Sequence, residues 1–325
     1  MATTVPTSVP DGPLELSLRA WFSALKRTVV NVFASDLTDR AAALTYYGVL
    51  SIFPALLAAV SVIGLLGRST SDKILHNVTD LAPGSVRDIL TDAIRNLQGS
   101  GGAAGVLFVV GVLAAWWSAS GYIAAFMRAS NAIYRVGEGR PIWKTAPLRL
   151  VITSLAGIIL LASALIVVLT GGLADHVGSA LGLGSALVTA WAIAKWPVLI
   201  LAIGLLFAVL YWASPNVKHG RFRWITPGSL LAVVMWVIVS GGFAVYVANF
   251  SSYNKTYGAL ATPIIFLTWL WLSNLAILVG AQFNAELERG REIAAGQPAD
   301  QEPYLEPRDT TKLDGEPAPH RTAPR

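Results

Sequence analysis

One apolar run constrains the fold of this chain more than any other feature. Residues 258–285 carry no charged side chain, include Trp269 and Trp271, and stop at Glu286. A helix needs about 20 apolar residues to cross the hydrocarbon core of a bilayer, and this run is longer than that. The run therefore predicts a membrane-spanning helix.

The composition of the whole chain points to the same class of protein. Hydrophobic residues make up 54% of the sequence, charged residues only 13%, and the mean hydropathy is +0.58. Because this leaves too little polar surface to cover a soluble globule, we expect an integral membrane protein. The chain has no cysteine, which excludes disulfides, thiolate metal sites and a cysteine nucleophile.

Apolar runs of similar length recur along the chain with no soluble-sized gap between them. The predicted fold is therefore all-α and polytopic, with a single membrane domain over residues 14–290. Six transmembrane helices are expected at about residues 41–67, 104–128, 148–171, 187–212, 227–249 and 258–285. Residues 1–13 lack the features of a cleavable signal peptide and are expected to be disordered, as is the polar tail 291–325.

Basic residues are distributed unevenly between the loops of this topology. With the amino terminus inside, the inner loops hold most lysines and arginines, whereas the outer loops hold few and mix them with aspartates. By the positive-inside rule, both termini are cytoplasmic. The net charge of +5 is then explained by these loops and by contact with anionic lipid headgroups. Membrane lipids are the expected partners, a homo-oligomer is left open, and no nucleic acid is expected.

Two segments outside the spans have the spacing of amphipathic interfacial helices. The first precedes the first span, and its apolar stripe consists of Leu18, Phe22, Leu25, Val29 and Val32. Arg19, Lys26 and Arg27 lie off that stripe, which favours a helix on the inner leaflet, although a helix packed inside the protein has the same pattern. The second lies in the long outer loop at about residues 74–97 and predicts a helical hairpin on the outer face.

Motifs that carry catalytic chemistry are missing from the sequence. It has no GxxxxGKS or GxxxxGKT phosphate loop, no HExxH zinc motif and no GxSxG nucleophile turn. The four histidines are His76, His176, His219 and His320, and they are dispersed without metal-ligand spacing. We therefore expect no catalytic residue, no metal site and no cofactor, and the chain is not predicted to be an enzyme.

Polar side chains on the first span are candidates for function, because an unpaired polar group in a membrane is costly. Tyr47, Ser51 and Pro54 share one helix face, and Tyr46 adjoins them. They could line a cavity or a substrate path. Alternatively, Ser51 bonds to its own helix backbone and the two tyrosines sit in the aromatic belt at the membrane surface.

Amide side chains mark the last span. Asn274 lies near its middle, and Gln282 and Asn284 lie near its end. Each could contact a substrate, but hydrogen bonding between helices is the commoner role of such groups in membranes. The remaining candidate cavity residues are Asn131, Tyr253, Asn254 and Tyr257.

Several segments together carry a family resemblance. They are AAALTYYGVLSIFP at residues 41–54, NAIYRVGEGRPIWK at 131–144, YWASPNVKHGRFRW at 211–224, NFSSYNKTYGAL at 249–260 and GAQFNAELER at 280–289. In this order they resemble the YihY/virulence factor BrkB family of integral membrane proteins, over most of the chain. The resemblance implies a six-helix domain in the bacterial plasma (inner) membrane with cytoplasmic termini. It also implies a link to envelope lipid export and serum resistance.

The chain departs from the family pattern at Gln282. Similar proteins usually carry an acidic residue there, in GAELNAEL, where this chain has a neutral amide. If that acid carried protons in the family, Gln282 could not do so, and the nearest carboxylates are Glu286 and Glu288. Members of the family have also carried the label ribonuclease BN. The absence of a cluster of metal-binding His and Asp argues against that activity here.

Two classes of function fit the sequence. A transporter or lipid-handling protein, for export or flipping, is favoured by the six spans, the polar side chains within them and the amphipathic helices. A structural or scaffold protein of the membrane needs only helix packing. A transporter predicts that Tyr47, Ser51, Asn274 and Gln282 converge on one water-accessible cavity. A scaffold predicts that they pair off in dry helix contacts.

Overall fold

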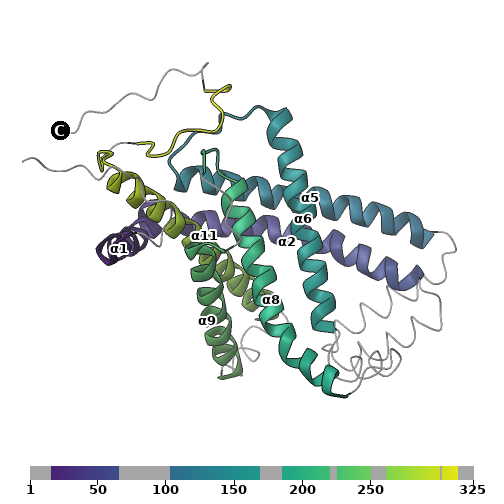
Figure 1. Ribbon diagram of the computed structural model, residues 1–325. Helices are drawn as coiled ribbons and strands as arrows, with labels where there is room; N and C mark the ends of the chain where they lie inside the picture. Colours follow the sequence, from purple (N-terminus) through teal and green to yellow (C-terminus); the bar gives the residue numbers. More distant parts are fainter. Residues whose placement is uncertain are drawn as a thin grey trace, which may run out of the picture. The chain divides into compact units, whose positions relative to one another are not determined.

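The computed structural model describes residues 16–65, 103–168, 185–219, 225–249, 261–300 and 302–313. In these ranges the chain forms seven α-helices and no β-sheet (Figure 1). They are α1 (Leu18–Ala34), α2 (Leu37–Leu65), α5 (Ala103–Ile133), α6 (Ile142–Val168), α8 (Ser185–Ala213), α9 (Pro227–Asn249) and α11 (Ala261–Ala294). The described part of the chain is therefore all-helical, as the sequence predicts.

The helices belong to two compact units. The first unit comprises the residues up to Thr45 together with those from Ile123 onward, and the second comprises Tyr46–Tyr122. Helices α2 and α5 each run from one unit into the other. In the first unit, α11 contacts α1, α8 and α9, and α8 also contacts α6 and α9.

Five of the described helices are long and apolar enough to cross a membrane. These stretches are Gly105–Ile133, Ile142–Ser163, Thr189–Ala213, Pro227–Val247 and Pro263–Ala294. They coincide with the second to sixth predicted spans. The first predicted span, 41–67, falls on α2, where the side chains of residues 56–65 lie outside the described part. The count of six spans therefore stays a prediction.

Most large apolar side chains on α6, α8 and α9 are exposed rather than packed within the first unit. Examples are Ile158, Leu161, Ile193, Leu201 and Ile238. In water such a surface would favour aggregation, whereas in a bilayer lipid chains cover it. These helices therefore have the surface expected of membrane spans.

The buried core of the first unit lies along α11. Leu278 and Leu287 are almost completely buried. Phe283 and Leu287 pack with Ala24 of α1, and the ring of Trp21 lies 5.8 Å from that of Phe283. This contact brings the amino-terminal helix against the end of the last helix.

Helix α1 packs through its small and polar side chains. Ser17 caps the helix by accepting a hydrogen bond from the backbone N–H of Ala20. The buried residues are Ala24, Thr28 and Asn31, which follow one another at helical spacing. The predicted apolar stripe faces the other way: Leu18 and Phe22 are 83% and 76% exposed. The apolar stripe is therefore not the surface by which α1 packs against the protein.

The carboxyl-terminal tail corrects the prediction of disorder over residues 291–325. Helix α11 continues to Ala294, and residues 302–313 lie against the loops between helices. Val217 pairs with Pro307 in an isolated antiparallel bridge, and the backbone N–H of Lys218 donates to the carbonyl of Glu306. Composition does not reveal these contacts, because they use backbone groups that every sequence has.

Three further predictions concern residues outside the described part. They are the disordered start at residues 1–13, the outer hairpin at about residues 74–97, and the last part of the tail, residues 314–325.

Candidate functional site

A buried carboxylate lies where α1 meets the charged end of α11. Glu286 is only 2% exposed. Its Oε2 accepts a hydrogen bond from Arg27 Nε at 2.6 Å, and its Oε1 accepts one from Asn31 Nδ2 at 2.7 Å. Arg27 Nη2 also donates to the backbone carbonyl of Glu286 at 3.1 Å. These donors from α1 provide the partners that a buried charge requires.

Gln282 lies one turn before Glu286 and is equally buried. Its Nε2 donates to Glu286 Oε1 at 3.2 Å, while its Oε1 has no hydrogen-bond partner within the described residues. An acid at this position would place a second buried carboxylate beside Glu286, with Arg27 as the neighbouring guanidinium. The amide removes that repulsion and supplies a donor instead. This gives a structural reason for the departure from the family pattern.

A basic pocket opens beside this carboxylate. Its volume is about 400 Å³. The lining residues are Ser23, Lys26, Arg27, Val30, Asn31 and Arg289. Lys26 is exposed and makes no ion pair within the described residues. Arg289 donates through Nη2 to the carbonyl of Ala299 at 2.7 Å and lies over the ring of Tyr304, so its contacts are with neutral groups.

Asn274, near the middle of α11, joins this helix to α2. Its Nδ2 donates to Thr45 Oγ1 at 3.0 Å, and Thr45 Oγ1 in turn donates to the carbonyl of Ala41 at 2.8 Å. Both side chains are buried. A second hydrogen bond joins the same two helices: Trp271 Nε1 donates to the carbonyl of Thr38. Asn274 therefore takes part in a helix–helix contact.

Asn284 joins α11 to the start of α9. Its Oδ1 accepts from the backbone N–H of Gly228 at 2.8 Å, and its Nδ2 donates to Thr226 Oγ1 at 2.8 Å. The amide thus satisfies a free N–H at the helix start. The two helices approach closely here, since a Cβ added to Gly228 would lie 2.2 Å from the carbonyl oxygen of Gly280.

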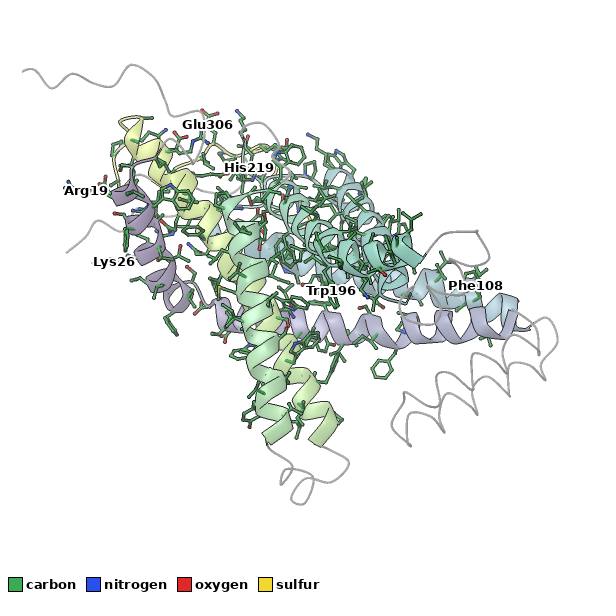
Figure 2. All side chains as sticks on the ribbon, turned by 60° about the horizontal axis from the view of Figure 1, so that its bottom comes forward. Arg19, Lys26, Phe108, Trp196, His219 and Glu306 are labelled. Atoms are coloured by element: carbon green, nitrogen blue, oxygen red, sulfur yellow. The ribbon has the colours of Figure 1, made fainter. Side chains whose placement is uncertain are left out.

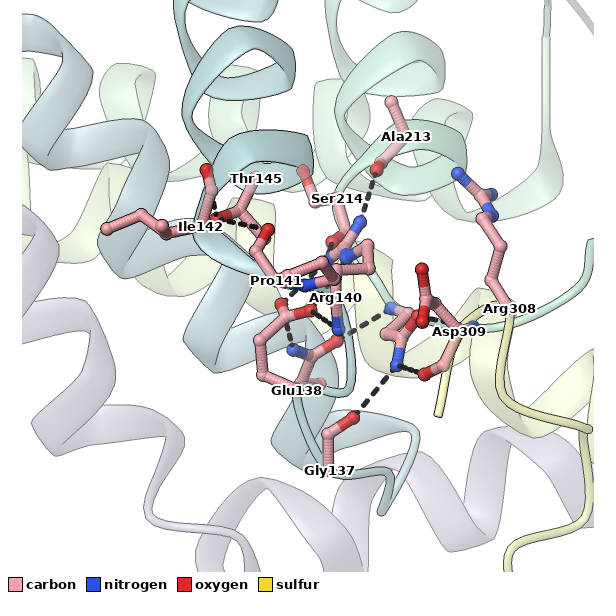
Figure 3. Close-up of polar contacts among 12 residues, drawn as sticks. Gly137, Glu138, Arg140, Pro141, Ile142, Thr145, Ala213, Ser214, Arg308 and Asp309 are labelled. Carbon is pink, nitrogen blue, oxygen red and sulfur yellow. Dashed lines mark hydrogen bonds and ion pairs between the residues drawn. The ribbon is translucent and has the colours of Figure 1, made fainter. Parts of the chain in front are cut away.

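Asn131 belongs to a different cluster, formed by the loop between α5 and α6, the loop between α8 and α9, and the tail. We call residues 131–141, 213–219 and 302–313 the loop layer (Figures 2 and 3). Asn131 Oδ1 accepts from the backbone N–H of Asn216 at 2.7 Å, and Asn131 Nδ2 donates to Glu138 Oε2 at 2.9 Å. The candidate residue is therefore held in a structural network.

Arg140 is the buried cation of the loop layer (Figure 3). Its Nε and Nη2 each donate to one oxygen of Glu138 at 2.7 Å, and Nη2 also donates to the carbonyl of Ser214 at 2.7 Å. Burial acts to raise the pKa of Glu138, but the hydrogen bonds and charge of Arg140 outweigh it and lower that pKa. The pair is therefore ionised and ties one loop to the other.

Asn216, in the loop between α8 and α9, binds both the tail and the loop between α5 and α6. Its Nδ2 donates to the carbonyls of Gly137 at 3.1 Å and Asp309 at 2.8 Å, and its Oδ1 accepts from the backbone N–H of Asp309 at 3.1 Å. Gly139 permits this approach, because a Cβ there would lie 1.9 Å from the carbonyl oxygen of Asp309. The tail therefore packs against the loop through a close backbone contact that requires glycine at position 139.

Aromatic rings surround a histidine–carboxylate pair in the loop layer. His219 Nδ1 lies 3.1 Å from Glu288 Oε1, and the ring of Tyr134 meets the His219 ring edge-on at 5.3 Å. Tyr304 of the tail lies against Tyr134. Burial, followed by the charge of Glu288, raises the pKa of both tyrosines. Both phenols are therefore neutral, and the tail contributes one of them.

The candidate residues of the second unit lie on α2. Ser51 Oγ donates to the carbonyl of Gly48 at 2.7 Å, which is the backbone contact given above as the alternative to a substrate path. Tyr46 is 62% exposed and contacts Tyr47 edge to face. Pro54 lies inside the helix. The predicted convergence of Tyr47 and Ser51 with Asn274 and Gln282 joins residues of different units and stays a prediction.

Three candidate residues, Tyr253, Asn254 and Tyr257, lie outside the described part of the chain. Conversely, reasoning from the sequence missed Glu138, Arg140 and Asn216, although all three lie in the segments that carry the family resemblance. Within the ranges given above, no three His, Cys, Asp or Glu side chains lie together as a metal site would require.

Comparison with known sequences matches nearly the whole chain. The profile of the family described as Virulence factor BrkB matches residues 28–304. YfkH of Bacillus subtilis (strain 168), which is named a ribonuclease-like protein, is 30% identical over 270 residues, which are 82% of this chain and 94% of YfkH.

Two further relatives are named as membrane proteins. A UPF0761 membrane protein of Alkalilimnicola ehrlichii is 34% identical over 269 residues, which are 79% of this chain but only 57% of that protein. A UPF0761 membrane protein of Alteromonas mediterranea is 30% identical over 262 residues, which are 78% of this chain and 83% of that protein. No solved structure matches the chain.

Proposed function

Because this chain belongs to the virulence factor BrkB family of membrane proteins, we propose that it handles lipids, binding phospholipid at one leaflet and moving it across the bilayer. The protein would act as a transporter, for export or flipping, in the bacterial inner membrane. Its partners would be the membrane lipids themselves.

The orientation of α1 carries this proposal. The helix turns Ala24, Thr28 and Asn31 toward the protein and leaves Phe22 and Val29 exposed. A helix with bulky apolar residues on its free face and basic residues beside them is typical of the headgroup region of a membrane. It would hold the protein against the lipids that the proposal requires it to bind.

The same arrangement supports an orientation in the membrane. The loop layer contains Arg135, Arg140 and Lys218, and Lys144 lies just beyond it. Basic loops are retained on the cytoplasmic side during insertion. We therefore propose that α1, the loop layer and both termini lie on the cytoplasmic side of the membrane.

A scaffold function is the second candidate, and the amides of α11 favour it. Asn274 pairs with Thr45, and Asn284 pairs with Gly228 and Thr226. Contacts of this kind are what a purely structural role predicts for buried polar groups. A scaffold would move no lipid.

A lipid flux assay separates the two functions. The purified chain is reconstituted into vesicles that carry a fluorescent phospholipid, and transfer between leaflets is followed with and without a pH gradient. The proposal predicts transfer above that of protein-free vesicles. A variant with Tyr47→Ala and Asn274→Ala should lose it if the path runs through α2 and α11. No transfer of any tested phospholipid by folded protein would support the scaffold instead.

A further inference from the structure

The basic pocket between α1 and α11 has more cations than its surroundings neutralise. Lys26, Arg27 and Arg289 line it, and Arg27 forms an ion pair with Glu286. Glu286 is buried and its oxygens are occupied by Arg27, Asn31 and Gln282. Among the described residues, Glu286 therefore offsets Arg27 and leaves Lys26 and Arg289 without a carboxylate partner.

The two remaining cations are free of acidic partners within the described residues. Lys26 makes no ion pair, and Arg289 contacts a backbone carbonyl and the ring of Tyr304. Two other exposed lysines of this unit have carboxylate partners: Lys144 binds Asp309 and Lys218 binds Glu306. At the pocket, by contrast, basic groups converge without a counter-ion from the part of the protein that the structure describes.

Hydrogen-bond donors line the pocket together with these charges. Arg27 uses Nε and Nη2 for Glu286, and its Nη1 makes no hydrogen bond within the described residues. The hydroxyl of Ser23 lies on the same wall. Arginine nitrogens, an ammonium group and a hydroxyl are the donors that bind phosphate oxygens in proteins.

The position of the pocket on α1 indicates which phosphate compound it takes. Ser23, Lys26 and Val30 follow one another at helical spacing, so they share one flank of the helix. This flank separates the buried face, marked by Ala24, from the exposed apolar face, marked by Phe22. A ligand with a phosphate in the pocket and hydrocarbon beside it would cover both surfaces.

We propose that the pocket formed by Lys26, Arg27, Arg289 and Ser23 binds the phosphate of an anionic phospholipid headgroup whose acyl chains lie along the exposed face of α1. The role of this site depends on the proposed lipid-handling function. The site adds to that function the class of lipid that is bound, an anionic phospholipid. A soluble phosphate compound shares the same chemistry, but it would leave the apolar face of α1 uncovered.

Spin-labelled lipids test this site in the full-length chain. The protein is reconstituted in phosphatidylcholine nanodiscs, and the motionally restricted fraction is measured for spin-labelled phosphatidylglycerol and for spin-labelled phosphatidylcholine. The wild-type chain should prefer phosphatidylglycerol. The Lys26→Gln, Arg289→Gln variant should lose most of this preference. Each cation removed should lower the affinity for phosphatidylglycerol relative to phosphatidylcholine about fivefold. The Lys144→Gln, Lys218→Gln variant removes the same charge elsewhere and should keep it.

Three results would overturn the site. Equal preference in the wild type and the pocket variant would show that the pocket does not bind the lipid. An equal loss in the control variant would show that net charge alone attracts the lipid. Saturable binding of glycerol phosphate that displaces no spin-labelled lipid would identify a soluble ligand instead. Lys26→Gln alone should keep the unfolding temperature of the wild type, because Lys26 makes no ion pair with any residue that the structure describes.

The lipid-binding result is independent of transport. Retained phosphatidylglycerol preference in a protein that moves no lipid would remove the proposed function but leave the site. Transport by a wild-type protein that shows no headgroup preference would remove the site but leave the function.

Discussion

Arg27 on α1 holds Glu286 on α11 through a hydrogen bond of 2.6 Å from Nε to Oε2, although the two residues lie 259 positions apart. The carboxylate is buried, whereas the guanidinium is partly exposed at the basic pocket. Arg27 thus connects the core of the first unit with the surface proposed to bind lipid.

Loss of Arg27 should destabilise the chain through the carboxylate that it leaves behind. Arg27→Met would leave Glu286 buried with only amide donors, and we expect a loss of about 3 kcal/mol in the free energy of unfolding. The double variant with Glu286→Met should recover part of this loss, because no buried charge remains. Chemical unfolding in detergent measures both. Additive losses in the double variant would contradict a coupled pair.

The crossing of α9 and α11 should not tolerate a methyl group. Gly228→Ala would place a Cβ 2.2 Å from the carbonyl oxygen of Gly280, so the helices must separate. We expect a destabilisation of about 2 kcal/mol, measured as a lower midpoint of thermal unfolding in detergent. Gly241→Ala on the same helix meets no atom within 4 Å and should be neutral. Equal effects of the two variants would exclude a close helix contact.

Asn216 should control the attachment of the tail. Asn216→Ala removes three hydrogen bonds to Gly137 and Asp309 and should weaken the attachment by about 1–3 kcal/mol. Trypsin should then cleave faster after Arg308 than in the wild type. Gln297→Ala, whose amide donates to Glu292 and not to the loops, is the matched control among the described residues. An unchanged cleavage rate in Asn216→Ala would contradict the proposed role.

The attachment of the tail should weaken in acid. The hydrogen bond from Lys144 holds the pKa of Asp309 well below its ordinary range. A carboxylate with a lowered folded-state pKa stabilises the attached state above its ordinary pKa of about 4, and this contribution is lost as the pH falls through the lower folded value.

Hydrogen exchange of the backbone amides of Arg308 and Lys312 checks this direction. Both amides donate to loop carbonyls and should stay protected from neutral pH down to about pH 4, with protection falling below that. Asp309→Asn should reduce the acid sensitivity. Protection lost as the pH rises toward neutrality, after correction for the intrinsic exchange rate, would contradict the sign.

Cysteine labelling should show on which side of the membrane the tail lies. The chain has no native cysteine, so single cysteines can be introduced without a background. Ala295→Cys, just after α11, should react with a membrane-impermeant maleimide only after the inner membrane is opened. Labelling of intact cells, with the periplasm accessible, would place the tail on the outer side and contradict the proposed orientation.

The helical fold could be predicted because its signal is local. Apolar runs such as 227–249 are long and carry no charge, and α9 has these same bounds, Pro227–Asn249. The orientation of α1 could not be predicted in the same way. The periodicity of Leu18, Phe22 and Leu25 identifies an apolar face, but it does not show whether protein or lipid covers that face.

The candidate site was harder to predict from the sequence, because the residues that contact one another in it are far apart in the chain. Glu286 has the position of an ordinary interfacial charge, and only the packing of α1 shows that it is buried with Arg27 and Asn31. Likewise, the polar tail has few apolar residues, yet Asn216 binds its backbone at Asp309. Composition describes side chains and therefore misses contacts made by the backbone.

Transport of phosphatidylglycerol by reconstituted protein tests the central claim most directly. Fluorescent phosphatidylglycerol should cross between leaflets faster in vesicles with the wild-type chain than in protein-free vesicles. The Lys26→Gln, Arg289→Gln variant should be slower, and the Lys144→Gln, Lys218→Gln variant should match the wild type. Transfer by folded wild-type protein no faster than in protein-free vesicles would contradict a lipid-handling function.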